Sequence, residues 1–276
     1  MTQINHLLTF IGEDAPFGDI TSDAVIGEEH CRCVIASRRS GIIAGLEEAG
    51  MLFSHFGVIV QQEFGDGDSV REGDILMRLS GRARDILLIE RTALNIIGRM
   101  SGIATATRAY VDRVRQVDSS CRLTCTRKTA PGLRMLDKKA VVLGGGDPHR
   151  LSLSDGILIK DNHLAIVPIE EAIRRARNSS LYRKIEVEAE SMDAAVRAAA
   201  SGADIIMLDN MPAELIEQTI RELEKRGVRD RVLIELSGGI SEENIDRYAG
   251  LGADTISLGA LTHSVKNLDV GLDITR

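Results

Sequence analysis

The second half of the chain alternates between short apolar runs and amphipathic stretches. The runs have the length and branched-aliphatic content of buried strands, and they predict strands at 122–127, 156–160, 184–188, 204–209, 232–237 and 255–259. In the intervening segments, apolar residues recur at spacings of three and four, which predicts helices over 192–200, 212–226 and 242–250. Strands that alternate with helices favour a parallel α/β architecture.

Two of these segments repeat each other. Ser201-Gly202-Ala203-Asp204 leads into the strand at 205–209, and Leu251-Gly252-Ala253-Asp254 leads into the strand at 255–259. A helix, a Gly-Ala-Asp turn and a buried strand form the unit of a parallel β/α barrel. Because only about six units are present, where a complete barrel has eight, the pattern predicts an open barrel.

The first part of the chain has a different pattern. It predicts a short helix at 7–11, strands at 32–37 and 57–62, a helix at 46–55, and turns at 66–68 and 72–74. A long helical pattern follows over 86–114, and Gly102 is expected to mark a break in it or a close contact. We predict an N-terminal α/β sandwich domain over 1–108, joined by the C-terminal tail 268–276, and a barrel domain over 109–267.

Composition narrows the class of protein. The 276 residues are 43% hydrophobic but only 3% aromatic, and the net charge is −7. Such a chain can bury a core, which argues against disorder, and the acidic balance with few aromatics argues against nucleic-acid binding. No run reaches the roughly 18 apolar residues of a membrane span, and no signal-like leader is evident, so a cytoplasmic location is expected.

The four cysteines fall into two close pairs, Cys31 with Cys33 and Cys121 with Cys125. Their spacings are not the usual ones of a zinc site, although such a site is conceivable. Each pair lies in a strand-like segment with both members on one face, which favours buried free thiols.

Polar residues follow the predicted barrel strands where each strand ends. They are Arg127-Lys128, Lys160-Asp161, Glu188, Asp209-Asn210, Ser237-Gly238-Gly239 and Gly259. Since the C-terminal ends of barrel strands meet at one mouth, where the sites of such barrels lie, this distribution predicts a single site. Cations are concentrated between Arg127 and Lys160 in an otherwise acidic chain, which indicates that the site binds anions.

Glycines follow the last two strands, in Ser237-Gly238-Gly239 and in Ser257-Leu258-Gly259. Glycine lets backbone N–H groups approach a phosphate, and the N-terminus of a following helix would add its dipole. The alternative is that these glycines only make tight turns.

Two carboxylates, Glu188 and Asp209, end successive strands. They suit a Mg²⁺ ion that is held partly by carboxylates and partly by the phosphates of a substrate. The alternative is a structural ion pair with a nearby lysine.

A series of short motifs resembles the quinolinate phosphoribosyltransferase family, the carboxylating nicotinate-nucleotide pyrophosphorylases, over nearly the whole chain. The motifs are Glu13-Asp14, Gly18-Asp19-Ile20-Thr21, Glu90 to Asn95, Ser101 to Ala104, Thr126-Arg127-Lys128-Thr129, Gly144-Gly145-Gly146 with His149-Arg150, Lys160-Asp161-Asn162-His163, Glu186-Val187-Glu188, Leu208-Asp209-Asn210, Ser237-Gly238-Gly239 and Leu261 to Ser264. Each motif is weak alone, but their common order is specific.

The resemblance implies a type II phosphoribosyltransferase-like fold and a homodimer in which Arg91 reaches the partner subunit's site. It implies a substrate-binding set of Arg91, Thr126, Arg127, Lys128, His149, Arg150, Lys160, Glu188, Asp209, Ser237, Gly238, Gly239, Ser257 and Gly259. Within this set Lys128, Lys160, Glu188 and Asp209 are expected to be catalytic, with Mg²⁺ as cofactor near Glu188 and Asp209.

The implied reaction transfers phosphoribosyl from phosphoribosyl pyrophosphate to quinolinate with decarboxylation, giving nicotinate mononucleotide, pyrophosphate and CO2 for NAD biosynthesis. Quinolinate is a dicarboxylate, so guanidinium groups can bind it through paired hydrogen bonds. His149 is expected to position a carboxylate rather than to donate a proton.

Two other classes share parts of this pattern. Molybdenum-transport-associated relatives have the same fold, but they tend to lose the Lys-Asp-Asn-His segment that is present here as Lys160 to His163. A non-catalytic anion-binding barrel would not need both Glu188 and Asp209 beside a cationic pocket.

Overall fold

The computed structural model describes residues 3–275, which form two compact units. The first unit comprises residues up to 106 together with 142–144 and the tail from 265, and the second comprises 107–141 and 145–264. The sequence-based prediction divides the two domains between residues 108 and 109, and it returns the chain to the first domain between residues 267 and 268. Among the described residues, no helix is long and apolar enough to cross a membrane.

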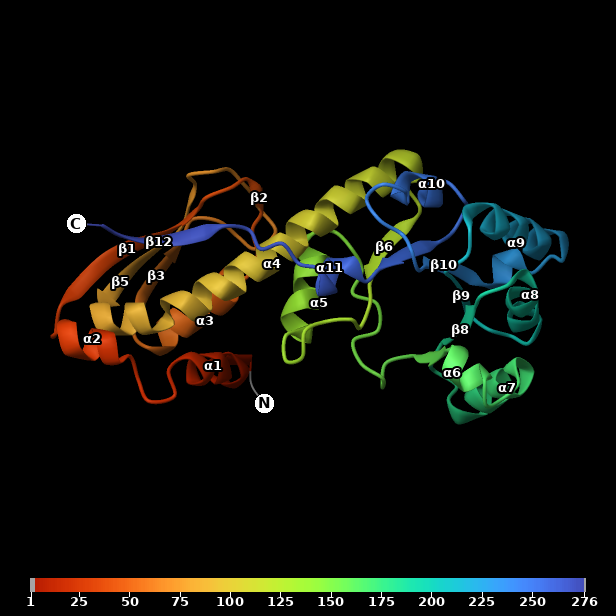
Figure 1. Ribbon diagram of the computed structural model, residues 1–276, viewed down its shortest axis with the longest axis horizontal. Coiled ribbons are helices and arrows are strands. Elements are labelled where there is room, and N and C mark those ends of the chain that lie inside the picture. The colour runs from red at the N-terminus through yellow and green to blue at the C-terminus, as the bar shows by residue number, and fades with distance from the viewer. Residues whose placement is uncertain (1–2, 276) are drawn as a thin grey trace. The chain divides into compact units, whose positions relative to one another are not determined.

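The second unit is built on a six-stranded parallel sheet (Figure 1). Its strands are β6 (Arg122–Cys125), β7 (Ile157–Ile159), β8 (Ile185–Ala189), β9 (Ile205–Asp209), β10 (Leu233–Ser237) and β11 (Thr255–Leu258). They lie in the order β6-β11-β10-β9-β8-β7, and β6 does not pair with β7. The sheet is therefore an open β/α barrel, as predicted, and the six predicted strands agree with the observed ones to within one or two residues at each end.

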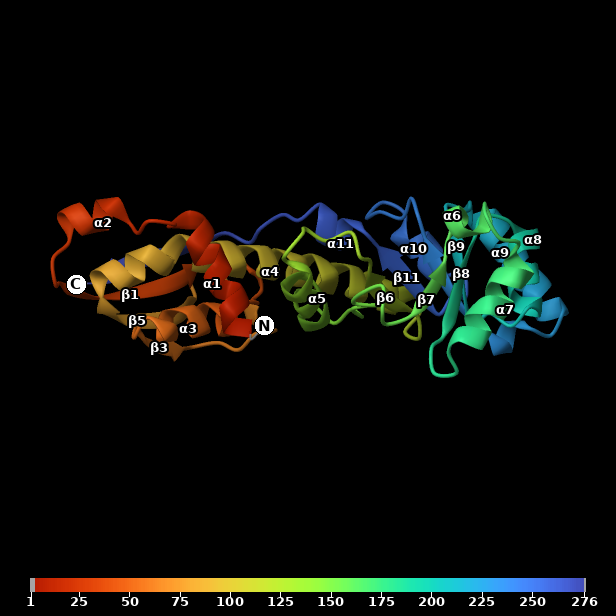
Figure 2. The same ribbon diagram turned by 90° about the horizontal axis from the view of Figure 1, so that it is seen from below.

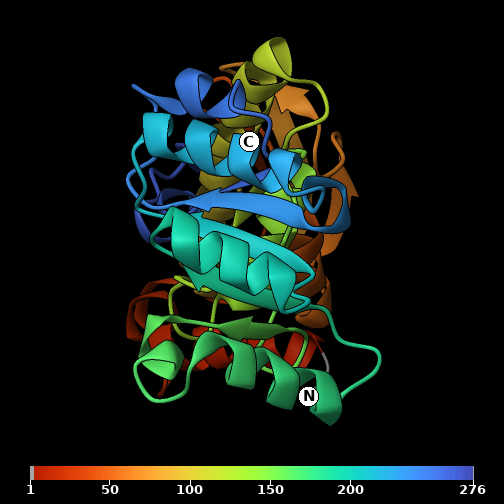
Figure 3. The same cartoon turned by 90° about the vertical axis from the view of Figure 1, so that its right-hand side faces the viewer.

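Helices follow most of these strands. They are α5 (Arg134–Leu143), α6 (Asp161–Leu164), α7 (Ile169–Ser179), α8 (Met192–Ala200), α9 (Ala213–Lys225), the 3-10 helix η1 (Arg229–Arg231), α10 (Ile245–Ala249) and α11 (Ala260–His263). Figure 3 shows α7, α8 and α9, coloured green to cyan, along the outer side of the strands. Their apolar faces cover the sheet through buried residues such as Ile173, Ala195 and Ile216. The polar residues at the strand ends are not covered by these helices and lie at the mouth of the barrel.

Both Gly-Ala-Asp turns have a structural role. Asp204 accepts a hydrogen bond from the backbone N–H of Ile185 and pairs with Arg177, while Asp254 accepts one from Ile234 and pairs with Arg229. The glycines Gly202 and Gly252 have positive φ angles, of 90° and 79°. The repeat thus fixes the entry of each strand at the end of the barrel opposite the mouth.

The first unit contains a four-stranded antiparallel sheet with the order β12-β1-β5-β3. Its elements are α1 (Gln3–Asp14), α2 (Ile20–Val25), β1 (His30–Ser37), β2 (Gly41–Ile42), α3 (Leu46–His55), β3 (Ile59–Gln62), β4 (Ser69–Val70), β5 (Ile75–Arg82), the start of α4 (Ala83–Val117) and β12 (Val270–Thr275). Helix α3 contacts β3, and α1 contacts α3 (Figure 2). Asp19 of the Gly-Asp-Ile-Thr motif caps α2 by accepting hydrogen bonds from Thr21 and Ser22.

The expected break at Gly102 is wrong, because α4 runs without interruption from Ala83 to Val117. The alternative, a close contact, is confirmed. A Cβ atom on Gly102 would lie 2.1 Å from the backbone oxygen of Lys266, a distance that no side chain permits. Glycine is required here because the chain passes directly against the helix.

All four cysteines are free thiols, and Cys33, Cys121 and Cys125 are buried while Cys31 is partly exposed. Burial raises the pKa of Cys33 and of Cys121 to about 12. Cys121 precedes β6 rather than lying within it. Among the described residues, no candidate metal-binding cluster includes a cysteine.

Candidate active site

A cavity of about 490 Å³ lies within the second unit at the C-terminal ends of its strands. Most predicted site residues line it: Thr126, Arg127, Lys128, His149, Arg150, Lys160, Asp209, Ser237, Gly238, Gly239 and Ser257. The remaining lining residues are Cys125, Leu158, Met207, Asn210 and Glu235. The barrel mouth therefore gathers residues that lie as far as 132 positions apart in the chain (125 to 257).

The remaining three predicted residues do not line this cavity. Arg91 is an exposed residue of α4 in the first unit. Glu188 is nearly buried, and its carboxylate accepts a hydrogen bond from Lys160, which does line the cavity. Gly259 packs beneath a lining side chain, since a Cβ atom there would lie 3.1 Å from Cδ of Lys128.

One wall of the cavity, the cationic wall, consists of Arg127, Lys128, His149 and Arg150. The backbone N–H of Lys128 donates to Thr126 Oγ1, and the Lys128 carbonyl accepts from the hydroxyl of Thr262, so the turn after β6 is held at both ends. Burial and the neighbouring Arg127 lower the pKa of Arg150. A dicarboxylate bound here would relieve the repulsion between these guanidinium groups.

The Nε atom of Arg127 is buried and has no hydrogen-bond partner among the described residues. A guanidinium N–H in a desolvated position costs free energy when it is unpaired. A planar anion that reached this side chain would satisfy it, because a guanidinium donates from a fixed fork that matches a carboxylate.

The second wall, the glycine wall, consists of Ser237, Gly238, Gly239 and Ser257. Gly238 and Gly239 have positive φ angles, of 82° and 65°, so their backbone turns in a way that favours glycine. A Cβ atom on Gly238 would lie 2.7 Å from the backbone nitrogen of Asn210, which itself donates to the Ser237 carbonyl. The turns after β9 and β10 thus interlock, and glycine is required at position 238 by both space and backbone conformation.

The helix dipole expected at the glycine wall has little structural support. Helix α10 begins at Ile245, well after Gly239, and α11 follows Gly259 directly but is only 4 residues long. Phosphate contacts in this wall would have to come from the backbone N–H groups of the glycine turns and from the serine residues rather than from a helix dipole.

Three carboxylates lie close to one another, and one of them, Asp209, lines the cavity. Oxygen atoms of Glu188, Glu190 and Asp209 all lie within 4.8 Å of one another, and Asp209 also accepts from its neighbour Asn210 at 2.6 Å. Hard oxygen ligands on adjacent strands fit Mg²⁺, which keeps several waters and binds through one or two carboxylates. The alternative pairing with a lysine also exists, because Glu188 contacts Lys160.

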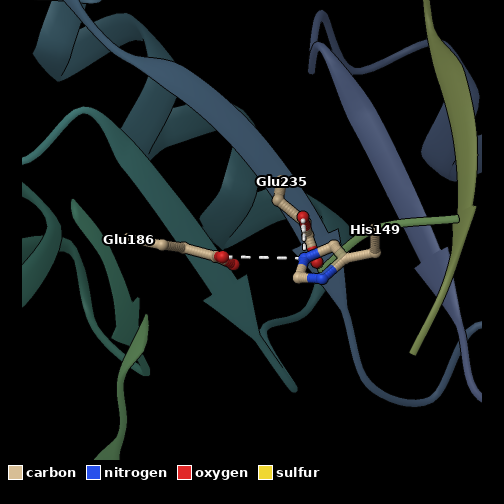
Figure 4. Close-up of side chains that lie close together, drawn as sticks. All are labelled: His149, Glu186 and Glu235. Carbon is tan, nitrogen blue, oxygen red and sulfur yellow. Dashed lines mark ion pairs between the residues drawn. The ribbon is translucent and has the colours of Figure 1, made fainter. Parts of the chain in front are cut away.

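A group that the sequence analysis did not recognise lies around His149 (Figure 4). The ring Nε2 lies 3.6 Å from Glu186 on β8 and 3.3 Å from Glu235 on β10, and all three side chains are largely buried. Burial lowers the pKa of His149, but the two carboxylates outweigh this effect and raise it to about 9. Burial also raises the pKa of Glu186, although His149 acts in the opposite direction.

A sequence signal for this group existed. Glu186 shares a strand face with Glu188, and Glu235 shares one with Ser237, because side chains alternate along a strand. A carboxylate inside an apolar barrel strand, on the same face as a site residue and two residues before it, indicates a polar group inside the barrel beneath that site residue. Glu186 was part of a recognised motif but had no role, and Glu235 belonged to no motif.

The fold and the cavity define a β/α-barrel protein that is suited to anionic, phosphate-bearing ligands. Comparison with known proteins makes this class specific. Residues 103–273 match the model of the quinolinate phosphoribosyl transferase C-terminal domain, and residues 19–101 match that of the N-terminal domain. The chain belongs to the quinolinate phosphoribosyltransferase family.

Individual relatives agree over almost the full length. The chain is 48% identical over 268 residues to a probable carboxylating nicotinate-nucleotide pyrophosphorylase of Methanothermobacter thermautotrophicus, covering 96% of each chain. It is 42% identical to the carboxylating nicotinate-nucleotide pyrophosphorylase of Mycobacterium leprae, covering 95% of this chain and 93% of the relative. The crystal structure of nicotinate-nucleotide pyrophosphorylase from Ehrlichia chaffeensis superposes with a TM-score of 0.93 at 33% identity, covering 100% of this chain and 99% of that one. None of these three relatives is a transport protein, so they give the molybdenum-transport alternative no support.

Proposed function

We propose that this chain is a carboxylating nicotinate-nucleotide pyrophosphorylase that converts quinolinate and phosphoribosyl pyrophosphate to nicotinate mononucleotide, pyrophosphate and CO2, a step of NAD biosynthesis. The observation that carries the proposal is that the cationic wall and the glycine wall line the same cavity. Family membership gives the reaction class, and the two walls fit its two anionic substrates.

The cationic wall is proposed to bind quinolinate. Arg127 and Arg150 can each form paired hydrogen bonds with a carboxylate, and Lys128 adds a point charge. The glycine wall is proposed to bind the phosphate of the second substrate through the backbone N–H groups of Gly238 and Gly239 and through Ser237 and Ser257. Gly259 belongs to the proposed site because a side chain at this position would crowd the side chain of Lys128.

The chemical step needs no protein nucleophile. The pyridine nitrogen bonds to C1 of the ribose as the bond from C1 to the pyrophosphate oxygen breaks, and the two walls hold these atoms in line. The positive charge of the quaternised ring nitrogen then stabilises the electron pair that stays on C2 as the 2-carboxylate leaves as CO2, and a proton bonds to that pair at C2. Lys128 and Lys160 stabilise negative charge on the departing pyrophosphate.

Glu188 and Asp209 are proposed to hold Mg²⁺ together with phosphoribosyl pyrophosphate. When bound, the ion would neutralise charge on the leaving group. Glu188 orients Lys160 through their contact, and Asp209 is the carboxylate that opens into the cavity.

The proposal also includes a cytoplasmic homodimer in which Arg91 reaches the partner subunit's cavity. Its support is the family motif Glu90 to Asn95, in which Arg91 is an exposed residue of α4. An isologous dimer would contain two such shared sites.

The reaction is tested with quinolinate labelled in its 2-carboxylate. Purified protein is expected to release labelled CO2 only when both phosphoribosyl pyrophosphate and Mg²⁺ are present, with one mononucleotide formed per CO2. Release of CO2 without phosphoribosyl pyrophosphate, or no release with both present, would contradict the proposed function.

A further inference from the structure

Three titratable side chains meet inside the barrel, and two of them, His149 and Glu235, line the cavity. The side chains of His149, Glu186 and Glu235 are 14%, 6% and 3% exposed, respectively. Figure 4 shows both glutamates directed at the same edge of the imidazole ring from the strands to either side of β9. The ring is the most exposed of the three and lines the cavity, so it is accessible to a ligand there.

The two carboxylates need a cation. Oε1 of Glu186 and Oε1 of Glu235 are buried and have no hydrogen-bond partner among the described residues. Ionised carboxylates in such a place are costly unless they are paired. Both approach a single ring atom, Nε2, and a protonated ring there supplies the charge that both lack.

The backbone also fixes His149. Its φ angle of 53° lies in the left-handed region, which is uncommon for a residue other than glycine. The preceding carbonyl, that of Pro148, accepts from the buried ammonium of Lys138 and from the thiol of Cys125 at 3.3 Å. The chain before it, at Asp147, pairs with β6 through Leu123 and Cys125. The ring is thus held from the backbone side as well as by the glutamates.

Other charged groups surround this cluster. The same cavity is lined by Arg127, Lys128, Arg150, Lys160, Asp209 and Cys125. Lys138 contacts the carbonyl of Pro148, the residue before His149. The cations among them disfavour a proton on His149, so the positive charge of the ring depends on the two glutamates.

We propose that Glu186 and Glu235 are positioning residues that hold the His149 ring in one orientation and in its doubly protonated form, so that it presents a fixed cation to a carboxylate of the dicarboxylate substrate. The proposal rests on the proposed function for the identity of that substrate. The ring Nδ1 has no partner among the described residues and is the remaining N–H of the ring.

The first test reads the ring directly and needs no activity. NMR titration of the histidine side chains, assigned with His149→Asn, should show His149 still protonated at pH 8 in the wild type, in line with its raised pKa. In Glu235→Gln the midpoint should fall by at least about one pH unit, because one of the two anions is gone. A wild-type His149 that titrates near its usual 6.5 overturns the proposal, whether or not the protein is active.

The second test uses the pH dependence of the reaction at saturating phosphoribosyl pyrophosphate. In Glu235→Gln, KM for quinolinate should be nearly unchanged at pH 6 and raised about threefold or more at pH 8.5, where most of the variant's rings have lost their proton. Glu235→Asp keeps the charge and should restore part of the affinity at pH 8.5. The matched control is Glu224→Gln, an exposed glutamate of α9, which should match the wild type at both pH values. An equal rise of KM at both pH values would indicate a purely structural role and overturn the proposal.

A substitute variant and a zinc-binding control complete the tests. If Glu235→Gln does not fold, Glu186→Gln replaces it with the same expectations, and the wild-type titration still decides. Zn²⁺ alone is the probe for the rival that the three ligands hold a metal ion. Stoichiometric Zn²⁺ binding that Glu235→Gln abolishes would overturn the proposal, whereas its absence supports the imidazolium.

Discussion

The two walls of the cavity are built in opposite ways. The cationic wall uses side chains that come from two separated segments, 127–128 and 149–150, and it depends on buried partners such as Glu235 and Lys138. The glycine wall uses mainly the backbone of short turns after adjacent strands, where side chains are absent or small. A wall that binds carboxylates through side chains is therefore adjusted by charge, whereas a wall that binds phosphate through the backbone is determined by backbone shape.

The largest expected effect comes from the carboxylates of Glu188 and Asp209. The double variant Glu188→Gln and Asp209→Asn should lower turnover by about 10²–10³-fold, because both the lysine orientation and the metal ligands are lost. The melting temperature should stay close to that of the wild type, and Glu224→Gln serves again as the control. A large loss of melting temperature with near-normal turnover would assign these residues to structural pairing instead.

The cationic wall is tested by Arg127→Ala. Loss of a charge-assisted, paired hydrogen bond is worth about 1.5–3 kcal/mol, so the affinity for quinolinate should fall roughly ten- to hundredfold with the fold intact. Isothermal titration calorimetry measures this effect, with the exposed Arg183→Ala as a matched control. Unchanged affinity in Arg127→Ala would remove quinolinate from this wall.

The glycine wall is tested by Gly238→Ala. The added methyl group would meet Asn210 and would also force alanine into a φ of 82°, a strain of about 1–3 kcal/mol. Because this strain would displace the turn that is proposed to bind the phosphate, KM for phosphoribosyl pyrophosphate should rise roughly tenfold. Gly202→Ala is the matched control, because it has the same backbone strain in a turn away from the cavity and no neighbour within 4 Å. Equal effects of the two variants on this KM would show that the contact with Asn210 is irrelevant.

The shared-site dimer predicts a smaller, restorative effect. At a low quinolinate concentration, at which neither the Arg91→Ala nor the Arg127→Ala homodimer turns over measurably, equal amounts of the two chains should regain about a quarter of wild-type activity after random pairing, because each heterodimer keeps one complete site. Subunit exchange is verified by mass spectrometry of differently tagged chains. If the chains exchange and the mixture stays inactive, Arg91 does not act across an interface.

The smallest effect is on stability. Because the pKa of His149 is raised from 6.5 to about 9 in the folded state, its pairing stabilises the fold fully below pH 6.5 and is lost as the pH rises through about 9. The pKa of Glu186 is also raised, so the stability that it contributes is likewise lost as the pH rises, beginning at a lower pH. The free energy of unfolding should fall by about 1–3 kcal/mol between pH 6.5 and 9.5, and the slope should be smaller in Glu235→Gln. Equal slopes for both proteins in chemical denaturation would contradict this assignment.

The sequence predicted the open barrel well because its strands carry two independent signals, an apolar run and a polar residue at its end. It predicted the first unit less completely. The inner strand β5 was not delimited, because a strand pattern does not reveal which segments pair, and one of its partners, β1, lies about 40 residues earlier in the chain. The continuity of α4 across Gly102 was missed because a glycine needed for close approach has the same local signature as a helix break.

The site was predictable where chemistry and strand ends coincide, as at Arg127 and Asp209. It was not predictable one layer deeper. Glu235 looks like an isolated polar residue in a buried strand, and only the spatial convergence of β8, β10 and the segment carrying His149 gives it a role. Likewise, the contact of Glu188 with Lys160 joins two residues whose separate motifs do not reveal the pair.

The division of labour between the two walls is tested most directly by one crossed measurement. KM values for quinolinate and for phosphoribosyl pyrophosphate are determined for the wild type, Arg127→Ala and Gly238→Ala under the same conditions. Arg127→Ala should raise mainly the KM for quinolinate, and Gly238→Ala should raise mainly the KM for phosphoribosyl pyrophosphate, each by roughly tenfold more than the other KM. Equal changes of both KM values in both variants would contradict the claim that the two walls bind different substrates.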